Sequence, residues 1–225
     1  MSGILCSFVG ASFGPAGPEA IGEAFGGGFY AGKVNDGGTE YYLIVAPKSS
    51  GQNSSVKIKT TIGASATISG IDSVVDGQSN TNSMPTNSSH PAKQWVSGLS
   101  IGGFTDWYIP AKNEMEILYY NLKPSNSQND TNFGDNPNAV PSRSGSSYTN
   151  YDSGSDTFSL VPTTTTVTSF QSGQSEEIDQ SGIFFTSTEA GGSSDVFGTT
   201  RTNGRFFARD YDQSLKVRAV RRVAV

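Results

Sequence analysis

Two short stretches of the sequence carry the apolar spacing of an amphipathic α-helix, and each is closed by glycine or proline. The apolar positions i, i+3, i+4 and i+7 of the first are Ala92, Trp95, Val96 and Leu99. The second repeats the spacing with Met115, Leu118, Tyr119 and Leu122. We predict one helix that begins at Ser89-His90-Pro91 and ends near Gly98, and another that runs from Pro110-Ala111 to Pro124.

Strand-like segments lie on both sides of these helices. Before them, residues 28–34 and 39–46 flank an Asn-Asp-Gly-Gly turn and predict a β-hairpin. After them, β-rich segments cover residues 182–186, 196–200, 205–209 and 216–223, with a hairpin turn at Asn203-Gly204. Strands, two helices and then an antiparallel meander indicate the α+β class and not an alternating α/β fold.

The composition favours a folded chain with much ordered loop. Aromatic residues make up 11% of the sequence and charged residues only 16%, while Ser, Thr, Asn and Gly supply most of the polarity. The stretch from about 125 to 168 predicts a long loop, which the scattered residues Phe133, Val140, Tyr148, Tyr151 and Phe158 could fasten to the body. We expect a Gly-rich arm over residues 1–28 and one domain over residues 29–225.

Charge and cysteine content exclude several classes of protein. The net charge is −5 and no basic patch appears outside the last strand, so nucleic-acid binding is not expected. A single cysteine, Cys6, allows no intramolecular disulfide. No apolar run approaches the roughly 20 residues of a membrane span. We expect a soluble protein that folds in a reducing cytoplasm and does not insert into a membrane.

The sequence offers little material for catalysis or for a cofactor. Its one histidine, His90, stands at a predicted helix start and far from Cys6, and no nucleophile elbow or phosphate loop appears. The paired carboxylates are expected on loops or helix surfaces, without apolar neighbours to raise a pKa; they are Glu114/Glu116, Glu176/Glu177 and Asp210/Asp212. The segment 152–156 predicts a solvated turn and not a calcium site. We therefore predict no catalytic residue, no metal and no cofactor.

Several ordered blocks of sequence resemble a known family. Residues 102–110 carry a Gly-Gly-Phe-Thr-Asp-Trp-Tyr-Ile-Pro sequence followed by Glu114, which resembles the signature of the DUF1566 family, also called the Lcl C-terminal domain family. Phe184-Phe185-Thr186-Ser187-Thr188-Glu189 and the closing Val217-Arg218-Ala219-Val220-Arg221-Arg222 resemble two further family blocks, in the same order. Upstream, residues 27–32 and 43–47 resemble the version found in phage structural proteins, and so do residues 89–92 and 121–124. The resemblance covers about residues 25–225.

The resemblance implies a C-type-lectin-like fold, with two helices packed on a small antiparallel sheet and long loops. It also implies a virion location, for a protein made in the cytoplasm of the host bacterium. On physical grounds, in agreement with it, we expect Trp107 to be a core anchor, as large aromatic side chains usually are, and Arg218, in a β-rich segment, to pair with a carboxylate at a junction of the fold. Phe185 stands where the family usually has Trp, and Asn136-Pro137-Asn138 is a poor substitute for the calcium-dependent sugar motif, so no such sugar site is expected.

In folds of this type the meander before the closing strand presents an exposed face, here residues 191–213. The host-binding candidates on it are Asp195, Phe197, Arg201, Asn203, Arg205, Phe206 and Tyr211. Arginine and aromatic side chains among small polar residues are typical of recognition surfaces. The alternative is a half-buried sheet with its phenylalanines inward and its arginines outward.

Three functions follow from these observations. The first is a bacteriophage tail fibre, tail tip or head-fibre knob that recognises a glycan or protein on the host surface. The second is a capsid or tail decoration or adaptor protein with a purely structural role. The third and weakest is an enzyme such as a glycan depolymerase. Either virion protein would dock to other virion proteins through its arm and form a homo-oligomer.

Overall fold

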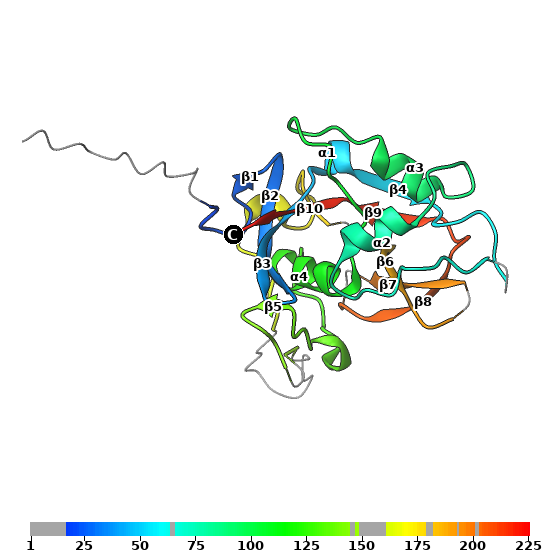
Figure 1. The fold of residues 1–225 in the computed structure, drawn as a ribbon. Helices are drawn as coiled ribbons and strands as arrows, with labels where there is room; N and C mark the ends of the chain where they lie inside the picture. Colours follow the sequence, from blue (N-terminus) through cyan, green and yellow to red (C-terminus); the bar gives the residue numbers. More distant parts are fainter. Residues whose placement is uncertain are drawn as a thin grey trace, which may run out of the picture.

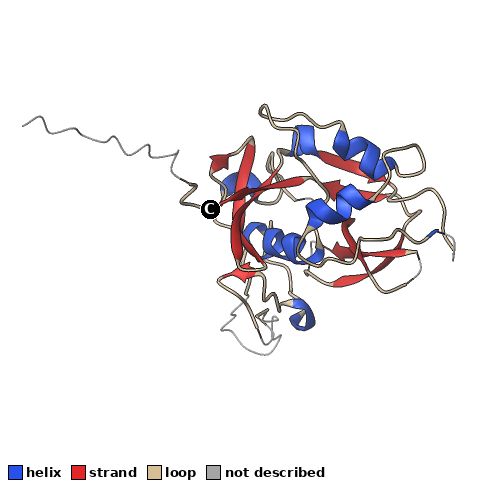
Figure 2. Ribbon diagram, in the orientation of Figure 1, coloured by secondary structure: helices blue, strands red, loops and turns tan. Residues whose placement is uncertain are grey.

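The protein, seen in a computed structural model, has ten strands and four α-helices in its described residues. These residues are 17–63, 66–144, 147–148, 161–178, 182–192, 194–200 and 203–225. The strands form two sheets that lie side by side, with the longest helix between them (Figures 1 and 2). The α+β class is confirmed, and two sheets replace the single small sheet that we expected.

The first sheet contains the predicted hairpin. Its strands, in order, are β1 (Ala24–Phe25), β2 (Gly28–Asp36), β3 (Thr39–Val45) and β10 (Val220–Ala224), and β5 (Ala139–Val140) also pairs with β2. Asp36 pairs with Thr39, so Gly37 and Gly38 alone form the turn. Their φ angles of +59° and +93° lie in a region that favours glycine, which explains why this sequence turns here.

The second sheet holds the C-terminal meander. Its order is β4 (Gln52–Val56), β9 (Leu215–Arg218), β6 (Ile183–Glu189), β7 (Asp195–Thr200) and β8 (Phe206–Asp210). Strands β6 and β9 run parallel, and the other neighbours run antiparallel. The prediction of one strand over residues 216–223 was wrong, because the chain passes from the second sheet to the first at Ala219.

A two-stranded ribbon joins the sheets. The chain leaves β3, makes the short helix α1 (Lys48–Gly51) and enters β4, while β9 and β10 run antiparallel beside it. At the crossing, Ala46 N–H donates to Ala219 C=O at 3.0 Å, and Ala219 N–H donates to Gly51 C=O at 2.8 Å. Hydrogen bonding is therefore continuous from one sheet to the other.

Arg218 fills the bend of this ribbon and is fully buried. Its Nε donates to Ala46 C=O at 2.6 Å, and its Nη2 forms an ion pair with Glu176 Oε2 at 2.7 Å. Burial lowers the pKa of Arg218 to about 10, and the nearby Glu176 carboxylate opposes that shift. The predicted pairing of Arg218 with a carboxylate at a fold junction is confirmed.

Two of the four helices were predicted. They are α3 (Pro91–Ser97) and α4 (Lys112–Leu122), whereas α1 and the polar helix α2 (Gly77–Ser83) gave no apolar repeat. Helix α4 packs against β2 of the first sheet and β6 of the second. The approach to β2 is close: Asn121 Nδ2 donates to Ala31 C=O at 2.7 Å, and a Cβ on Gly32 would lie 2.6 Å from the same nitrogen. Gly32 therefore lets the helix reach the strand.

Apolar side chains cover both faces of the first sheet. Tyr30 and Ile44 belong to one buried cluster together with Trp107, and Ala31 and Leu43 belong to another with the apolar face of α4. Trp107 is only 4% exposed, and its Nε1 donates to Phe104 C=O at 3.1 Å, so its predicted role as a core anchor is confirmed.

Part of the segment that we assigned to the arm belongs to the first sheet. Strand β1 pairs with β2, and Gly22 N–H donates to Tyr30 C=O at 2.8 Å. Residues 1–16, with Cys6, lie outside the described residues. The single-turn 3-10 helices η2 (Thr131–Phe133) and η3 (Thr168–Phe170) complete the described elements.

We predict that Glu176→Gln lowers the free energy of unfolding by about 3 kcal/mol, because the buried Arg218 loses its counter-charge. The matched control is Glu177→Gln, since the Glu177 carboxylate accepts a hydrogen bond from Gly173 N–H in an exposed turn and pairs with no cation of the described residues. That control is expected to change stability by less than about 0.5 kcal/mol. Urea denaturation measures both. Equal effects of the two substitutions would contradict the role given to Arg218.

Candidate functional site

The predicted recognition face on β7 and β8 is only partly exposed. Phe206 is 4% exposed and Tyr211 is fully buried, each within one of the two core clusters. Burial raises the pKa of Tyr211 to about 12. The two rings stabilise the sheet and are not available to a partner. Arg205 is exposed beside the inward Phe206, as the half-buried alternative predicts.

The remaining candidates lie in different environments. Phe197 is half-buried, and its ring packs edge-to-face on Phe206 with the Lys112 ammonium 5.1 Å from its centre. Asp195 lies opposite Asp210 on the neighbouring strand, and desolvation and that second carboxyl raise its pKa. Asn203 Oδ1 accepts from Arg205 N–H at 3.2 Å and shapes the turn. Arg201 lies outside the described residues.

We predict that Phe206→Ala lowers the free energy of unfolding by about 3 kcal/mol, because it leaves a cavity beside α4. Arg205→Ala, one residue earlier and exposed, should change stability by less than about 0.5 kcal/mol. Thermal or urea denaturation checks the pair. A neutral Phe206→Ala variant would show that this ring is not part of the core.

The carboxylates of α4 correct our expectation that they lie on the helix surface. Glu114 is fully buried. Its Oε2 accepts from Ala111 N–H at 2.8 Å and from Gly77 N–H at 3.2 Å, which ties the starts of α4 and α2 together. Its Oε1 accepts from the Tyr108 hydroxyl at 2.5 Å. Burial raises the pKa of Glu114 to about 7, and these hydrogen bonds oppose that shift.

Because the pKa of Glu114 is raised from 4.5 to about 7 on folding, the folded state binds this proton more tightly than the unfolded state. The protonated carboxyl of Glu114 therefore stabilises the folded state fully below about pH 4.5, and this stabilisation is lost as the pH rises through about 7. We predict that the stability of the parent, relative to Glu114→Gln, falls by about 3 kcal/mol over that range. Urea denaturation at a series of pH values tests this. A pH-independent difference between the two proteins would contradict it.

Glu116, on the same helix, is also buried and fully engaged by protein partners. It accepts hydrogen bonds from Asn136 Nδ2 and from the Tyr148 hydroxyl, and it forms an ion pair with Arg143. Burial raises its pKa, and the Arg143 charge opposes the shift. The ring of Tyr148 is buried, as expected for a fastening point of the long loop. Glu116 thus anchors that loop to α4.

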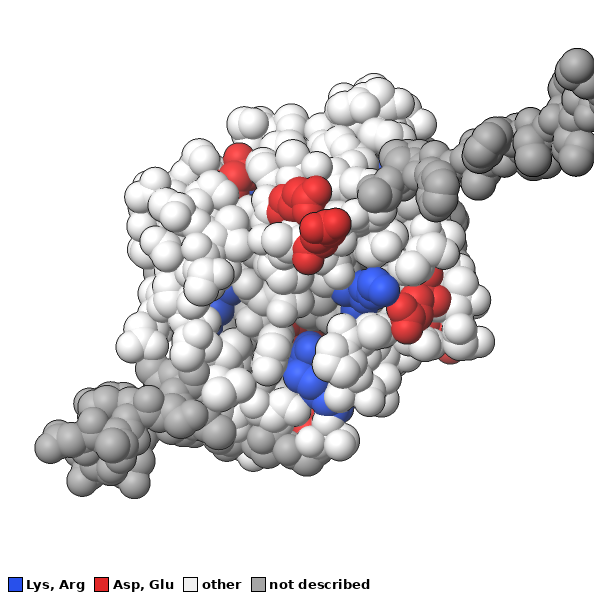
Figure 3. Space-filling view, turned by 90° about the vertical axis from the view of Figure 1, so that its left-hand side faces the viewer, with Lys and Arg blue, Asp and Glu red and all other residues white. Residues whose placement is uncertain are grey.

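Other charged residues of the family-like blocks also make structural contacts. Arg221 donates to both oxygens of Asp106, at 2.7 and 2.8 Å, and its guanidinium lies 3.9 Å from the centre of the Phe104 ring. Arg222 pairs with Asp36 and Asp76. On the side of the molecule that carries the first sheet, charged side chains form a few separate clusters on a largely uncharged surface (Figure 3).

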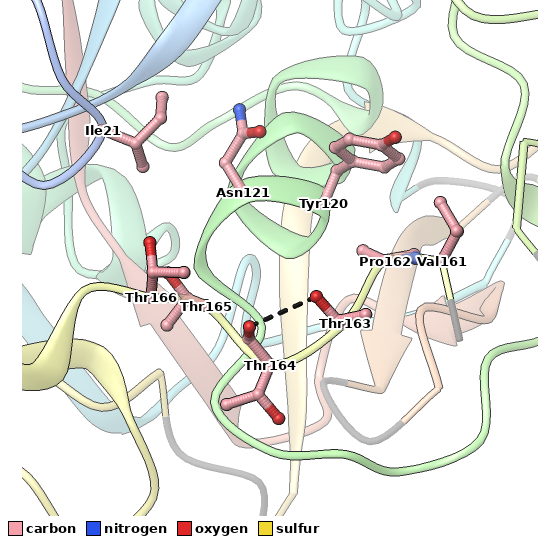
Figure 4. Close-up of a pocket in the computed structure, with 9 residues that line it drawn as sticks. All are labelled: Ile21, Tyr120, Asn121, Val161, Pro162, Thr163, Thr164, Thr165 and Thr166. Carbon is pink, nitrogen blue, oxygen red and sulfur yellow. Dashed lines mark hydrogen bonds between the residues drawn. The ribbon is translucent and has the colours of Figure 1, made fainter. Parts of the chain in front are cut away.

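An open groove of about 290 Å³ lies beside the C-terminal half of α4 (Figure 4). Its lining comes from three separate parts of the chain: Ile21, then Tyr120 and Asn121 of α4, and residues 161–166. The last of these includes four consecutive threonines, Thr163 to Thr166. Among the described residues, no acidic or basic side chain lines this groove. We call it the threonine groove.

A buried lysine holds the threonine wall in place. Lys123 Nζ donates to Pro162 C=O at 3.1 Å, to Asn129 Oδ1 at 2.6 Å and to Ser127 C=O. The backbone of Lys123 also holds the wall, because its C=O accepts a hydrogen bond from Thr165 N–H at 2.8 Å. Burial lowers the pKa of Lys123 to about 8. The wall is therefore fixed by hydrogen bonds at both of its ends.

Sequence reasoning missed this groove. The threonine run lies in the stretch that predicts a long loop, and Lys123 stands in a block that resembles a family sequence. The only local signal is the run Pro162-Thr163-Thr164-Thr165-Thr166 itself, which repeats one hydrogen-bonding side chain four times.

Within the described residues, no group of three or more His, Cys, Asp or Glu side chains could hold a metal ion. No helix in that part of the chain is long and apolar enough to cross a membrane. Comparisons of the chain with protein-family models, with curated proteins and with solved structures found no match.

Proposed function

We propose that this chain is a bacteriophage virion protein with a C-type-lectin-like fold that recognises the host surface. The phage location and the lectin-like fold rest on the resemblance of its ordered sequence blocks to the DUF1566 family. Two helices beside small sheets and long fastened loops are compatible with that fold. The arm would dock to other virion proteins, and a homo-oligomer would present several copies to the host.

The threonine groove is the observation that carries the recognition function. It is concave, open to solvent and lined by hydroxyl, amide and apolar groups, which is the chemistry of a binding site. Hydrogen bonds of Lys123 with Pro162 and Thr165 order its threonine wall without a ligand. The exposed part of the meander, with Asn203 and Arg205, is a second surface that could contact the host.

The carboxylates favour binding over catalysis. Glu114 and Glu116 are buried in hydrogen-bond networks with protein partners, and Glu176 neutralises Arg218. A glycoside hydrolase needs two carboxyl groups that face its substrate. Glu114, Glu116 and Glu176 instead hold helices, loops and sheets together.

A capsid or tail decoration protein is the second candidate function. The supporting observation is the largely uncharged surface in Figure 3, which would also suit packing on a protein lattice. In that case the groove and the meander would contact neighbouring virion subunits and not the host.

Competition for adsorption tests the proposal. Purified chain, added in excess to host cells, is expected to lower the adsorption rate of the phage that carries it about tenfold, because it occupies the receptor. Cryo-electron microscopy of that phage should place the chain at a tail tip or fibre end. Unchanged adsorption together with density lying flat on the capsid would favour the decoration protein.

A further inference from the structure

We infer that the threonine groove is a binding site for a neutral saccharide. This inference deepens the proposed recognition function and rests on it, because it names the class of host molecule that the groove takes. It concerns a surface distant in sequence from the predicted meander face, and it requires no metal ion.

The charge of the lining selects the class of ligand. Burying a charged group is costly unless an opposite charge pairs with it, and no acidic or basic side chain of the described residues lines the groove. An acidic sugar or a phosphorylated ligand would therefore lose hydration without gaining a partner. The net charge of −5 on the chain further disfavours an anionic ligand.

The polar atoms of the lining match the hydroxyl groups of a sugar. A threonine hydroxyl both donates and accepts, so it can bond to a sugar hydroxyl in either direction. The hydroxyl of Thr163 makes one long hydrogen bond, to Thr164 C=O at 3.4 Å, and lies on the side of the wall that faces the other lining residues (Figure 4). Thr163 and Thr166 are both exposed, so their hydroxyls can reach a ligand. Asn121, which also lines the groove, uses Nδ2 on Ala31 C=O at 2.7 Å, and this bond leaves its side-chain oxygen as an acceptor.

Apolar groups complete the match. Ile21, Val161 and Pro162 line the same groove, and the threonine methyl groups add to them. The C–H faces of a sugar ring can pack on such groups while its hydroxyls reach the polar atoms. The volume of about 290 Å³ is at the small end for ligand pockets, which suits one or two sugar units at the end of a glycan.

The groove is also pre-organised, which lowers the entropy lost on binding. Thr165 is buried, its Oγ1 accepts from Val167 N–H at 3.3 Å, and its C=O accepts from Gln171 Nε2 at 3.0 Å. Lys123 bonds to Pro162 C=O through its side chain and to Thr165 N–H through its backbone. These two bonds restrict the backbone of Thr163 and Thr164, which lie between them.

The test is a binding measurement on the purified full chain. A panel of neutral oligosaccharides built from hexoses, 6-deoxyhexoses and N-acetylhexosamines is compared with the same structures bearing a uronic or sialic acid. We expect at least one neutral saccharide to bind, and its acidic counterpart to bind about tenfold more weakly. Failure of every neutral saccharide to bind, or a preference for the acidic ones, would overturn the inference.

Two variants locate the site. Thr163→Val with Thr166→Val removes two hydroxyls of the wall and keeps its shape, and it is expected to weaken binding about tenfold or more with an unchanged melting temperature. Thr168→Val is the matched control, because Thr168 is exposed and does not line the groove. If the double variant binds the saccharide as the parent does, the site lies elsewhere.

Saccharide binding and adsorption competition together separate this inference from the recognition function. If the parent competes with phage for host cells but binds no neutral saccharide, recognition stands and the saccharide site in the groove is refuted. If the parent binds the saccharide through the groove but never competes for adsorption, the site stands and the proposed recognition function is refuted.

Discussion

The buried guanidinium of Arg218 lies where the two sheets meet, and the rest of the fold depends on how its charge is satisfied. It bonds to Ala46 C=O at the end of β3, to Gln52 at the start of β4 and to Glu176 in a distant loop. A buried cation tolerates few arrangements of its partners, so this residue fixes the bend of the ribbon. Both sheets take their relative position from that bend.

Charged and polar side chains act elsewhere in the core in the same way. Glu114 joins the starts of two helices, Glu116 fastens the long loop to α4, and Lys123 supports the threonine wall. Each links segments that carry too few apolar residues to pack by themselves. A chain with 34% hydrophobic residues thereby gains ordered loops, and these loops supply the candidate binding surface.

Local patterns predicted the elements whose stability is local. The hairpin at Gly37-Gly38 and helices α3 and α4 follow from turn chemistry and apolar spacing, and the core position of Trp107 follows from the usual burial of large aromatic side chains. Helix α2 escaped prediction because it buries Asn80 and Thr81, which bond to Ser73 and Ile109 and give no apolar repeat. The groove escaped because its walls come from segments that only the folded chain brings together.

The crossing of the chain at Ala219 also constrains how the protein is assembled. Strand β9 separates β4 from β6 within the second sheet, and β10 completes the first sheet beside β3. Residues 215–224 therefore pair with residues of β3 and β4 that come about 160 or more positions earlier, such as Gln52 with Arg218. Neither sheet can close during synthesis until these residues have left the ribosome. The nascent chain must keep its unpaired strand edges soluble until then, and its sparse charge leaves that task to the Ser, Thr and Asn side chains.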